Sequence, residues 1–161
     1  MKNFVSAILV LLLVVPLCVI AKVQVESWST EDNVLVLYAQ VPELEMVDVY
    51  LAFDAGSTRD GKKYGLANLV SALILQGASD LNVDEFNEAI GLTGGNLSSG
   101  SSSDMAYIKM RSLTEQANLE AVMRLLKLAL SSPRFDDSDV NRLVARTLIG
   151  LDFKKQSPAA V

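Results

Sequence analysis

The clearest hydrophobic pattern in the chain lies in the segment 66–76, which ends before Gly77. Apolar residues recur there at the helical spacing of three and four, and they are Leu66, Leu69, Val70, Leu73 and Ile74. This pattern predicts a helix with one buried face, and Gly77 falls where a left-handed C-terminal cap is expected. The opposite face would carry Asn68, Ser71 and Ala72, which are mutual neighbours on a helix.

Alternating and short apolar runs predict strands on both sides of this helix. The predicted elements are strands at 34–41 and 46–55, helices at 66–76 and 82–90, a strand at 105–111, and helices at 116–130 and from 136 to before Pro158. The serine-rich segment 96–103 is open to two interpretations, a flexible linker or an edge strand of small residues. This order indicates an α+β fold, in which helices pack on one face of a mainly antiparallel sheet.

Polar residues mark the starts of two later helices. Asn82 and Glu85 have the spacing of a capping box, and residues 136–138 are suited to cap the last helix. The inner side of that last helix is expected to carry Val140, Leu143, Val144, Thr147, Leu148 and Leu151. With 161 residues, half of them apolar, the chain has material for about one domain with a substantial core.

The first 21 residues have the pattern of a secretory signal peptide. Lys2 is followed by an apolar run at 4–17, and short residues precede a cleavage point before Lys22. An uncleaved membrane anchor is the alternative, because residues 4–21 are close to the minimum length that spans a bilayer. We therefore expect a secreted protein whose folded part is 22–161, with an anchored chain as the alternative.

Composition removes several classes of chemistry. Cleavage before Lys22 would remove Cys18, the only cysteine, and the chain has no histidine at all. Disulfide, thiol and Ser-His-Asp chemistry would then be excluded. Without Lys2, 13 of the 14 basic side chains remain against 19 acidic ones, a net charge of −6. This acidic balance argues against nucleic acid as a partner, because such binding depends on clustered Lys and Arg.

The remaining candidate groups are isolated. The loop 56–61 lacks the Gly-Lys-Ser/Thr ending of a phosphate-binding loop. Asp54, Asp60 and Asp104 stand apart from one another in the sequence. We expect them to serve as loop and cap residues rather than as an acid–base pair.

Several blocks of the sequence follow one another in a specific order, at 47–57, 64–68, 75–78, 94–96, 104–107, 125–135 and 139–158. Together they resemble the N-terminal domain of the pitrilysin/insulinase metallopeptidase family, to which mitochondrial processing peptidase and many paired bacterial periplasmic proteins belong. The resemblance runs from about Val34 to the C-terminus and implies an insulinase-like domain at 22–161, truncated at its C-terminal end. It also implies the periplasm of a Gram-negative bacterium, or its inner membrane if the N-terminal segment is retained.

Active members of that family bind zinc through His-x-x-Glu-His on the helix after a Gly-Ser loop, together with a glutamate from a late helix. By resemblance, Asn68 and Ala72 stand where the histidines belong, and Ser71 stands at the general base. Gly150 falls at or near the glutamate ligand, and Leu143 near a second acidic position. The resemblance therefore implies a degenerate motif without catalytic residues, metal ligands or a zinc cofactor.

Peptide binding is the function that the resemblance leaves. In active relatives, the edge strand that corresponds to Asn96, Leu97, Ser98 and Ser99 receives an extended peptide by strand addition. The alternative is a solvated edge that merely resists aggregation. The resemblance implies a non-catalytic subunit that pairs with an active zinc peptidase and helps to present its substrate. Zinc-dependent proteolysis within a complex only, and a membrane-anchored scaffold, are the alternatives.

Overall fold

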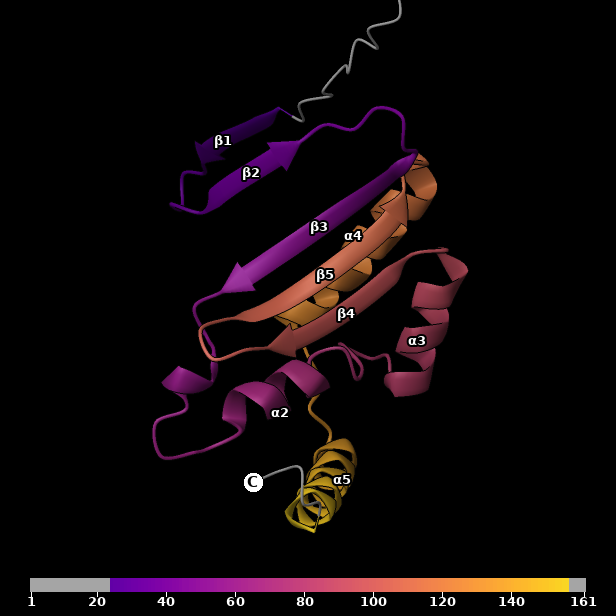
Figure 1. Cartoon of the computed structure of the whole chain (residues 1–161). Helices are drawn as coiled ribbons and strands as arrows, with labels where there is room; N and C mark the ends of the chain where they lie inside the picture. Colours follow the sequence, from indigo (N-terminus) through magenta and orange to yellow (C-terminus); the bar gives the residue numbers. More distant parts are fainter. Residues whose placement is uncertain (1–23, 157–161) are drawn as a thin grey trace, which may run out of the picture. The chain divides into compact units, whose positions relative to one another are not determined.

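The computed structural model describes residues 24–156, which form two compact units with the division between Leu44 and Glu45. The predicted signal segment, residues 1–21, lies outside the described residues. Figure 1 labels the helices and strands of both units. None of the helices between residues 24 and 156 is both long and apolar enough to cross a membrane.

The first unit is a two-stranded antiparallel hairpin. It consists of β1 (Val25–Ser29) and β2 (Leu35–Ala39). Thr30 closes the turn, because its backbone N–H donates to the carbonyl oxygen of Val34 at 3.0 Å and its hydroxyl accepts from the N–H of Val34 at 3.1 Å. β2 confirms the strand predicted at 34–41, whereas β1 was not predicted. Its five residues include three polar ones, which is too weak a pattern to indicate a strand.

The second unit contains a three-stranded antiparallel sheet in the spatial order β3-β5-β4. The outer strands β3 (Met46–Phe53) and β4 (Asn96–Ser101) both pair with the central β5 (Ala106–Leu113). The serine-rich segment therefore forms an edge strand, and the linker interpretation is wrong. Its small side chains suit this position, because two of them form hydrogen bonds to a neighbouring helix.

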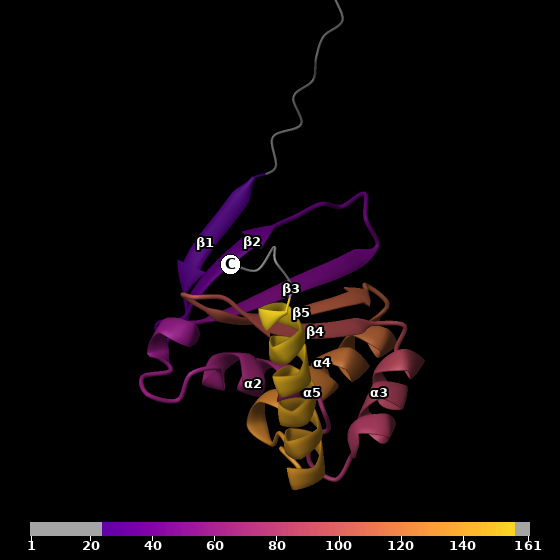
Figure 2. The ribbon, with the colours of Figure 1, turned by 60° about the horizontal axis from the view of Figure 1, so that its bottom comes forward.

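The helices of this unit are α2 (Leu66–Leu73), α3 (Val83–Leu92), α4 (Gln116–Ser131) and α5 (Asp137–Lys155), with a short 3₁₀ turn, η1 (Ser57–Arg59). In Figure 2 the helices α2, α3 and α4 lie on one face of the sheet. The predicted class, an α+β fold with a mainly antiparallel sheet and helices packed on one face, is confirmed.

Helix α4 holds the core together. Ile108 and Met110 of β5 pack against Val122 and Leu126 of α4. A second cluster around Phe86 joins α3 to the other side of α4. Each of these side chains is buried, and full burial of one such side chain contributes about 1.5–3 kcal/mol.

The two predicted caps have different outcomes. The capping box of α3 is confirmed, since Asn82 Oδ1 accepts from the N–H groups of Asp84 and Glu85 at 3.0 and 3.1 Å, and Glu85 accepts from the N–H of Asn82 at 2.9 Å. Asp136 is the N-cap residue of α5, but its side chain forms no capping bond. That carboxylate instead accepts from Arg134 Nε at 2.9 Å.

The predicted inner side of α5 is only partly correct. Val140 and Leu143 in its first half are half-buried, whereas Leu148 and Leu151 in its second half are exposed. The helix is amphipathic only near its start, where it packs against α2. Periodicity identified the apolar positions but not the extent of the surface that covers them.

Candidate functional site

Helix α2 begins at a tightly constrained turn. Gly65 has φ of 89°, a left-handed conformation that glycine adopts without strain. The carboxylate of Asp60 accepts hydrogen bonds from the N–H groups of Gly65 and Ala67, both at 2.8 Å. Asp60 therefore satisfies two of the free donors at the start of the helix, as expected for a cap residue. Its buried position fits that role.

The end of α2 comes earlier than predicted. The helix stops at Leu73, with Ile74 as its C-cap residue in a right-handed conformation. Gly77 does have a positive φ of 105°, but it lies beyond the cap in the following turn. The predicted cap position is therefore wrong by several residues, although glycine is required there because a Cβ atom would lie 2.9 Å from the carbonyl oxygen of Leu81.

The two faces of α2 are not buried as the sequence predicted. Ser71, expected on the free face, is only 6% exposed, while Leu66 and Val70 on the expected buried face are 41% and 39% exposed. The polar face packs against β4: Ser99 Oγ donates to the carbonyl oxygen of Ser71 at 2.6 Å. Small polar side chains allow this close approach of helix and strand, which a hydrophobicity pattern does not detect.

The structure places the residues that the resemblance aligns with the zinc motif in different surroundings. Asn68 Oδ1 accepts a hydrogen bond from Ser101 Oγ at 3.0 Å, and Ser71 is buried beside β4. Ala72 is exposed and lines a cleft between α2 and α5. Gly150 does not line this cleft, and a Cβ atom added to it would meet nothing within 4 Å.

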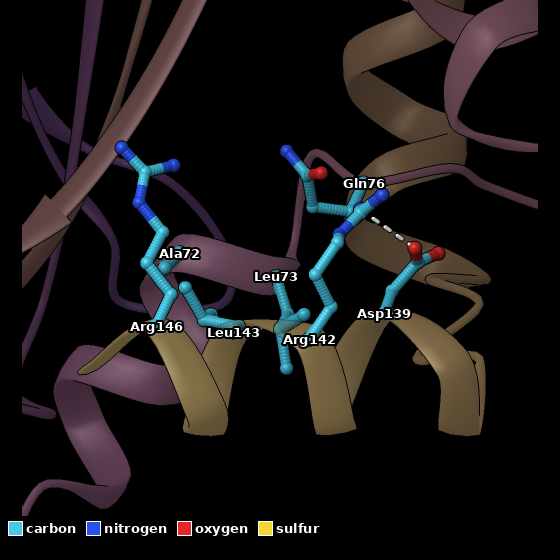
Figure 3. A pocket seen from close by; sticks show the side chains of 7 residues that line it. All are labelled: Ala72, Leu73, Gln76, Asp139, Arg142, Leu143 and Arg146. Atoms are coloured by element: carbon cyan, nitrogen blue, oxygen red, sulfur yellow. Dashed lines mark hydrogen bonds and ion pairs between the residues drawn. The ribbon is translucent and has the colours of Figure 1, made fainter. Parts of the chain in front are cut away.

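The cleft between α2 and α5 has a volume of about 350 Å³. Its lining residues are Ala72, Leu73, Gln76, Asp139, Arg142, Leu143 and Arg146. Figure 3 shows the long side chains of Arg142 and Arg146 rising from α5 beside α2. The sequence reasoning missed these two arginines. Their spacing of four residues, on either side of the predicted inner residue Leu143, was the available signal.

These residues do not fit a zinc ion. Ala72 and Gly150 have no donor atom, and two guanidinium groups line the cleft beside Ala72. No group of three or more His, Cys, Asp or Glu side chains within residues 24–156 is placed to hold a metal ion. No chemical step through a bound metal is derived from this arrangement.

Edge strand β4 has one set of backbone groups that faces away from β5. Antiparallel pairs alternate between residues that exchange hydrogen bonds and residues that do not. Thr114 N–H donates to the carbonyl oxygen of Glu45 at 3.2 Å, in register with the β3–β5 ladder. Ser102 N–H donates to the carbonyl oxygen of Met105 at 2.8 Å, in register with the β4–β5 ladder. Even-numbered residues of β5 therefore bond to β3 and odd-numbered ones to β4.

This alternation divides the predicted peptide-binding residues into two groups. Asn96 and Ser98 lie opposite odd-numbered residues of β5, so their backbone groups bond to β5. Leu97, Ser99 and Ser101 lie opposite even-numbered residues, so their N–H and C=O groups point away from β5. Within residues 24–156, no backbone group of a turn or loop forms a hydrogen bond with the N–H and C=O groups of Leu97, Ser99 and Ser101.

The sheet face opposite the helices carries a charged and aromatic cluster. Arg111 donates to both carboxylate oxygens of Asp48, through Nε at 2.6 Å and Nη2 at 2.7 Å. This hydrogen bonding lowers the pKa of the Asp48 carboxyl and raises the pKa of Arg111. The rings of Tyr50 and Tyr107 stack at 5.5 Å, and Lys109 Nζ lies 5.0 Å from the Tyr107 ring centre.

The fold and the site define an α+β domain in which helices pack on one face of an antiparallel sheet, and helix α2 carries no His, Cys, Asp or Glu side chain. The family model described as "Insulinase (Peptidase family M16)" matches residues 35–152. The chain therefore belongs to the insulinase family of peptidases, family M16. No match was found among curated proteins.

Solved structures of this family share the fold. The inactive domain of an M16 peptidase from Pseudomonas fluorescens aligns with a TM-score of 0.81 and 30% identity, over 84% of this chain and 33% of that one. A protease from Helicobacter pylori aligns with a TM-score of 0.69 and 19% identity, over 86% of this chain and 33% of that one. A mutant of the ferredoxin protease FusC, solved in complex with Arabidopsis ferredoxin, aligns with a TM-score of 0.72 and 20% identity, over 87% of this chain and 16% of that one. The chain thus spans at most a third of these proteins.

Proposed function

We propose that the protein is a non-catalytic member of its family that binds an extended peptide along the free edge of β4. The observation that carries this proposal is the row of outward N–H and C=O groups at Leu97, Ser99 and Ser101, next to a helix without catalytic side chains. Strand addition depends on main-chain hydrogen bonds, so it does not need the metal that active relatives use. The inactive M16 domain from Pseudomonas fluorescens supports a non-catalytic role.

A proline substitution tests the proposed peptide edge. Ser99→Pro removes the central outward N–H, and an edge strand tolerates proline when that N–H faces away from the sheet. We expect it to weaken binding of a labelled, unstructured peptide about tenfold, since a hydrogen bond contributes about 0.5–1.5 kcal/mol. Fluorescence anisotropy measures this affinity, and circular dichroism checks the fold. Ser98→Pro is not a suitable test, because the Ser98 N–H bonds to β5 and its loss would disturb the ladder.

Two further variants make this experiment specific. Ala52→Pro removes an outward N–H from β3, the other edge of the same sheet, and should leave peptide affinity unchanged. Ser99→Ala keeps the N–H and removes only the hydroxyl. A loss of peptide affinity that Ser99→Ala and Ser99→Pro share is therefore caused by the missing hydroxyl. Equal affinities of Ser99→Pro and Ser99→Ala for the peptide would disprove strand addition at β4.

We extend this proposal to the cellular role. The chain would be secreted to the periplasm of a Gram-negative bacterium and would pair with an active zinc-peptidase relative, to which it presents the bound peptide. Co-purification of the two chains from periplasmic extract tests the pairing, and mass spectrometry of the mature N-terminus distinguishes cleavage before Lys22 from a retained anchor. Proteolysis that requires both chains would support the presenting role. Recovery of this chain free of any such relative would contradict it.

A further inference from the structure

We propose that the cleft between α2 and α5 is a binding site for a carboxylate group, and that the bound peptides are therefore acidic. This inference deepens the proposed function, on which it rests for the peptide but not for the carboxylate site itself. Of the residues that the resemblance aligns with the zinc motif, Ala72 lines this cleft.

The charge of the cleft comes from two arginines on one face of α5. Arg142 and Arg146 are four residues apart, so their side chains lie one turn from each other. Both line the cleft of about 350 Å³, within the range of volumes that small ligands occupy. In Figure 3 the side chains of the two arginines extend from α5 beside Ala72 of α2 and Gln76 of the turn that follows it.

The arginines are incompletely neutralised by their neighbours. Arg142 Nη2 donates to Asp139 Oδ1 at 2.7 Å, and Asp139 is the only carboxylate that lines the cleft among residues 24–156. Arg146 forms no ion pair with any residue between 24 and 156. The cleft therefore has an excess of one positive charge in a chain whose formal net charge is −5.

This donor set matches a carboxylate. A guanidinium group presents a planar fork of N–H donors that pairs with the two oxygens of a carboxylate. Gln76, in the turn that follows α2, adds a side-chain amide that donates without adding charge.

The cleft lies on the same helix that holds the proposed peptide edge. Ser71 of α2 is hydrogen-bonded to β4, and the adjacent residue Ala72 lines the cleft. A peptide on β4 would therefore run along α2, where an acidic side chain or the peptide's own C-terminal carboxylate would meet Arg146. Both sources offer the same chemistry, and the experiment below separates them.

Small model compounds test the site without any peptide. N-acetylglutamic acid amide represents an acidic side chain, N-acetylglycine represents a chain terminus, and N-acetylglutamine amide is the neutral control. Nitrogen-15 NMR at constant ionic strength follows the Arg142 and Arg146 Nε–H signals. We expect saturable shifts with at least one carboxylate compound and none with the neutral one. Shifts no larger than those of Arg124, an exposed arginine of α4, would disprove the site.

Peptide affinities separate this inference from the proposed function. A neutral amidated peptide, the same peptide with one glutamate, and the same peptide with a free C-terminus are compared on wild-type protein, Arg146→Gln and Arg124→Gln. We expect about tenfold tighter binding of one acidic form, lost in Arg146→Gln and kept in Arg124→Gln. Equal affinity for all three peptides would disprove the carboxylate site and leave strand addition intact. Binding of the model compounds without binding of any peptide would support the carboxylate site and disprove strand addition.

Discussion

Ser99 Oγ donates a hydrogen bond to the backbone carbonyl oxygen of Ser71, 2.6 Å away, and this bond joins the edge strand β4 to helix α2. The acceptor belongs to the residue that the resemblance aligns with the general base of active relatives. A carbonyl oxygen near a helix end has no intrahelical partner, so the hydroxyl satisfies a group that packing against β4 would otherwise leave unpaired. Ser71 therefore has a structural role, because its carbonyl oxygen links α2 to β4.

Ser99→Ala should lower the free energy of unfolding by about 1 kcal/mol, because it removes this partly buried hydrogen bond. Urea denaturation followed by circular dichroism measures the change. Ser98→Ala is the matched control on the same strand, since Ser98 is exposed and should change stability by less than about 0.5 kcal/mol. Equal stability of the two variants would show that the bond to Ser71 contributes nothing.

Ser112→Ala should have the opposite effect. Ser112 is 1% exposed on β5, and its hydroxyl has no hydrogen-bond partner among the described residues. An unsatisfied buried polar group costs about 1–3 kcal/mol, so its removal is expected to be neutral or to stabilise the fold. The same urea titration measures the difference. A clear loss of stability in Ser112→Ala would indicate that the hydroxyl has a partner.

Asp60→Ala should destabilise the start of α2. The carboxylate accepts from two backbone N–H groups, of Gly65 and Ala67, and loss of a helix cap costs about 0.5–2 kcal/mol. Hydrogen exchange should show faster exchange at both of these amides. Asp54→Ala removes only an exposed ion pair with Arg59 and serves as the control, with little change expected. Unaltered exchange at Gly65 and Ala67 would contradict the capping role.

Gly56→Ala should be strongly destabilising. A Cβ atom at Gly56 would lie 2.3 Å from the carbonyl oxygen of Ser103 and 2.5 Å from the backbone nitrogen of Met105, which are not free to move as side chains are. Overpacking of this kind costs about 1–3 kcal/mol or more. Thermal unfolding measures it. Gly150→Ala is the control: it lies on α5 with open space around it, so alanine should stabilise the helix by about 0.5–1 kcal/mol.

The ion pair between Asp48 and Arg111 gives a pH-dependent prediction. The pKa of Asp48 is lowered in the folded chain, so the pair's contribution is present above the ordinary carboxyl pKa and is lost as pH falls through the lowered value. The pair is exposed, so the effect on stability is small. Arg111→Gln should raise the Asp48 pKa towards its ordinary value, which a carbon-13 NMR titration of the carboxyl measures. An unchanged pKa would exclude Arg111 as the cause.

The sequence was most informative where a short local pattern is enough to determine the local structure. The capping box at Asn82 and Glu85, and the strand character of β2 and β5, follow from local patterns that the fold preserves. The sequence did not reveal which face of α2 is buried, because Ser71 is covered through hydrogen bonding to β4 rather than by hydrophobic packing. A scale of hydrophobicity assigns such a residue to solvent.

In the candidate site, too, some residues could be found from local sequence patterns and others only from the tertiary structure. Asn68, Ser71 and Ala72 were assigned to motif positions by their resemblance to a known motif and its spacing, and this assignment stays a prediction. Arg142 and Arg146 were not found from the sequence, because their importance depends on which residues of α2 face them across the cleft. Likewise, only the strand register separates the outward residue Ser99 from the inward Ser98. Such information is tertiary and cannot be read from local patterns.

The strand order β3-β5-β4 has a consequence for strand pairing while the chain is being synthesised. β4 and β5 are adjacent in sequence and pair as soon as both exist, whereas β3 needs a partner whose nearest residue, Ala106, is made long after Phe53. At about 5–20 residues per second, that delay is about 3–10 seconds. During it, β3 lacks its sheet neighbour, so the backbone groups of Met46–Phe53 stay unpaired until β5 has been made.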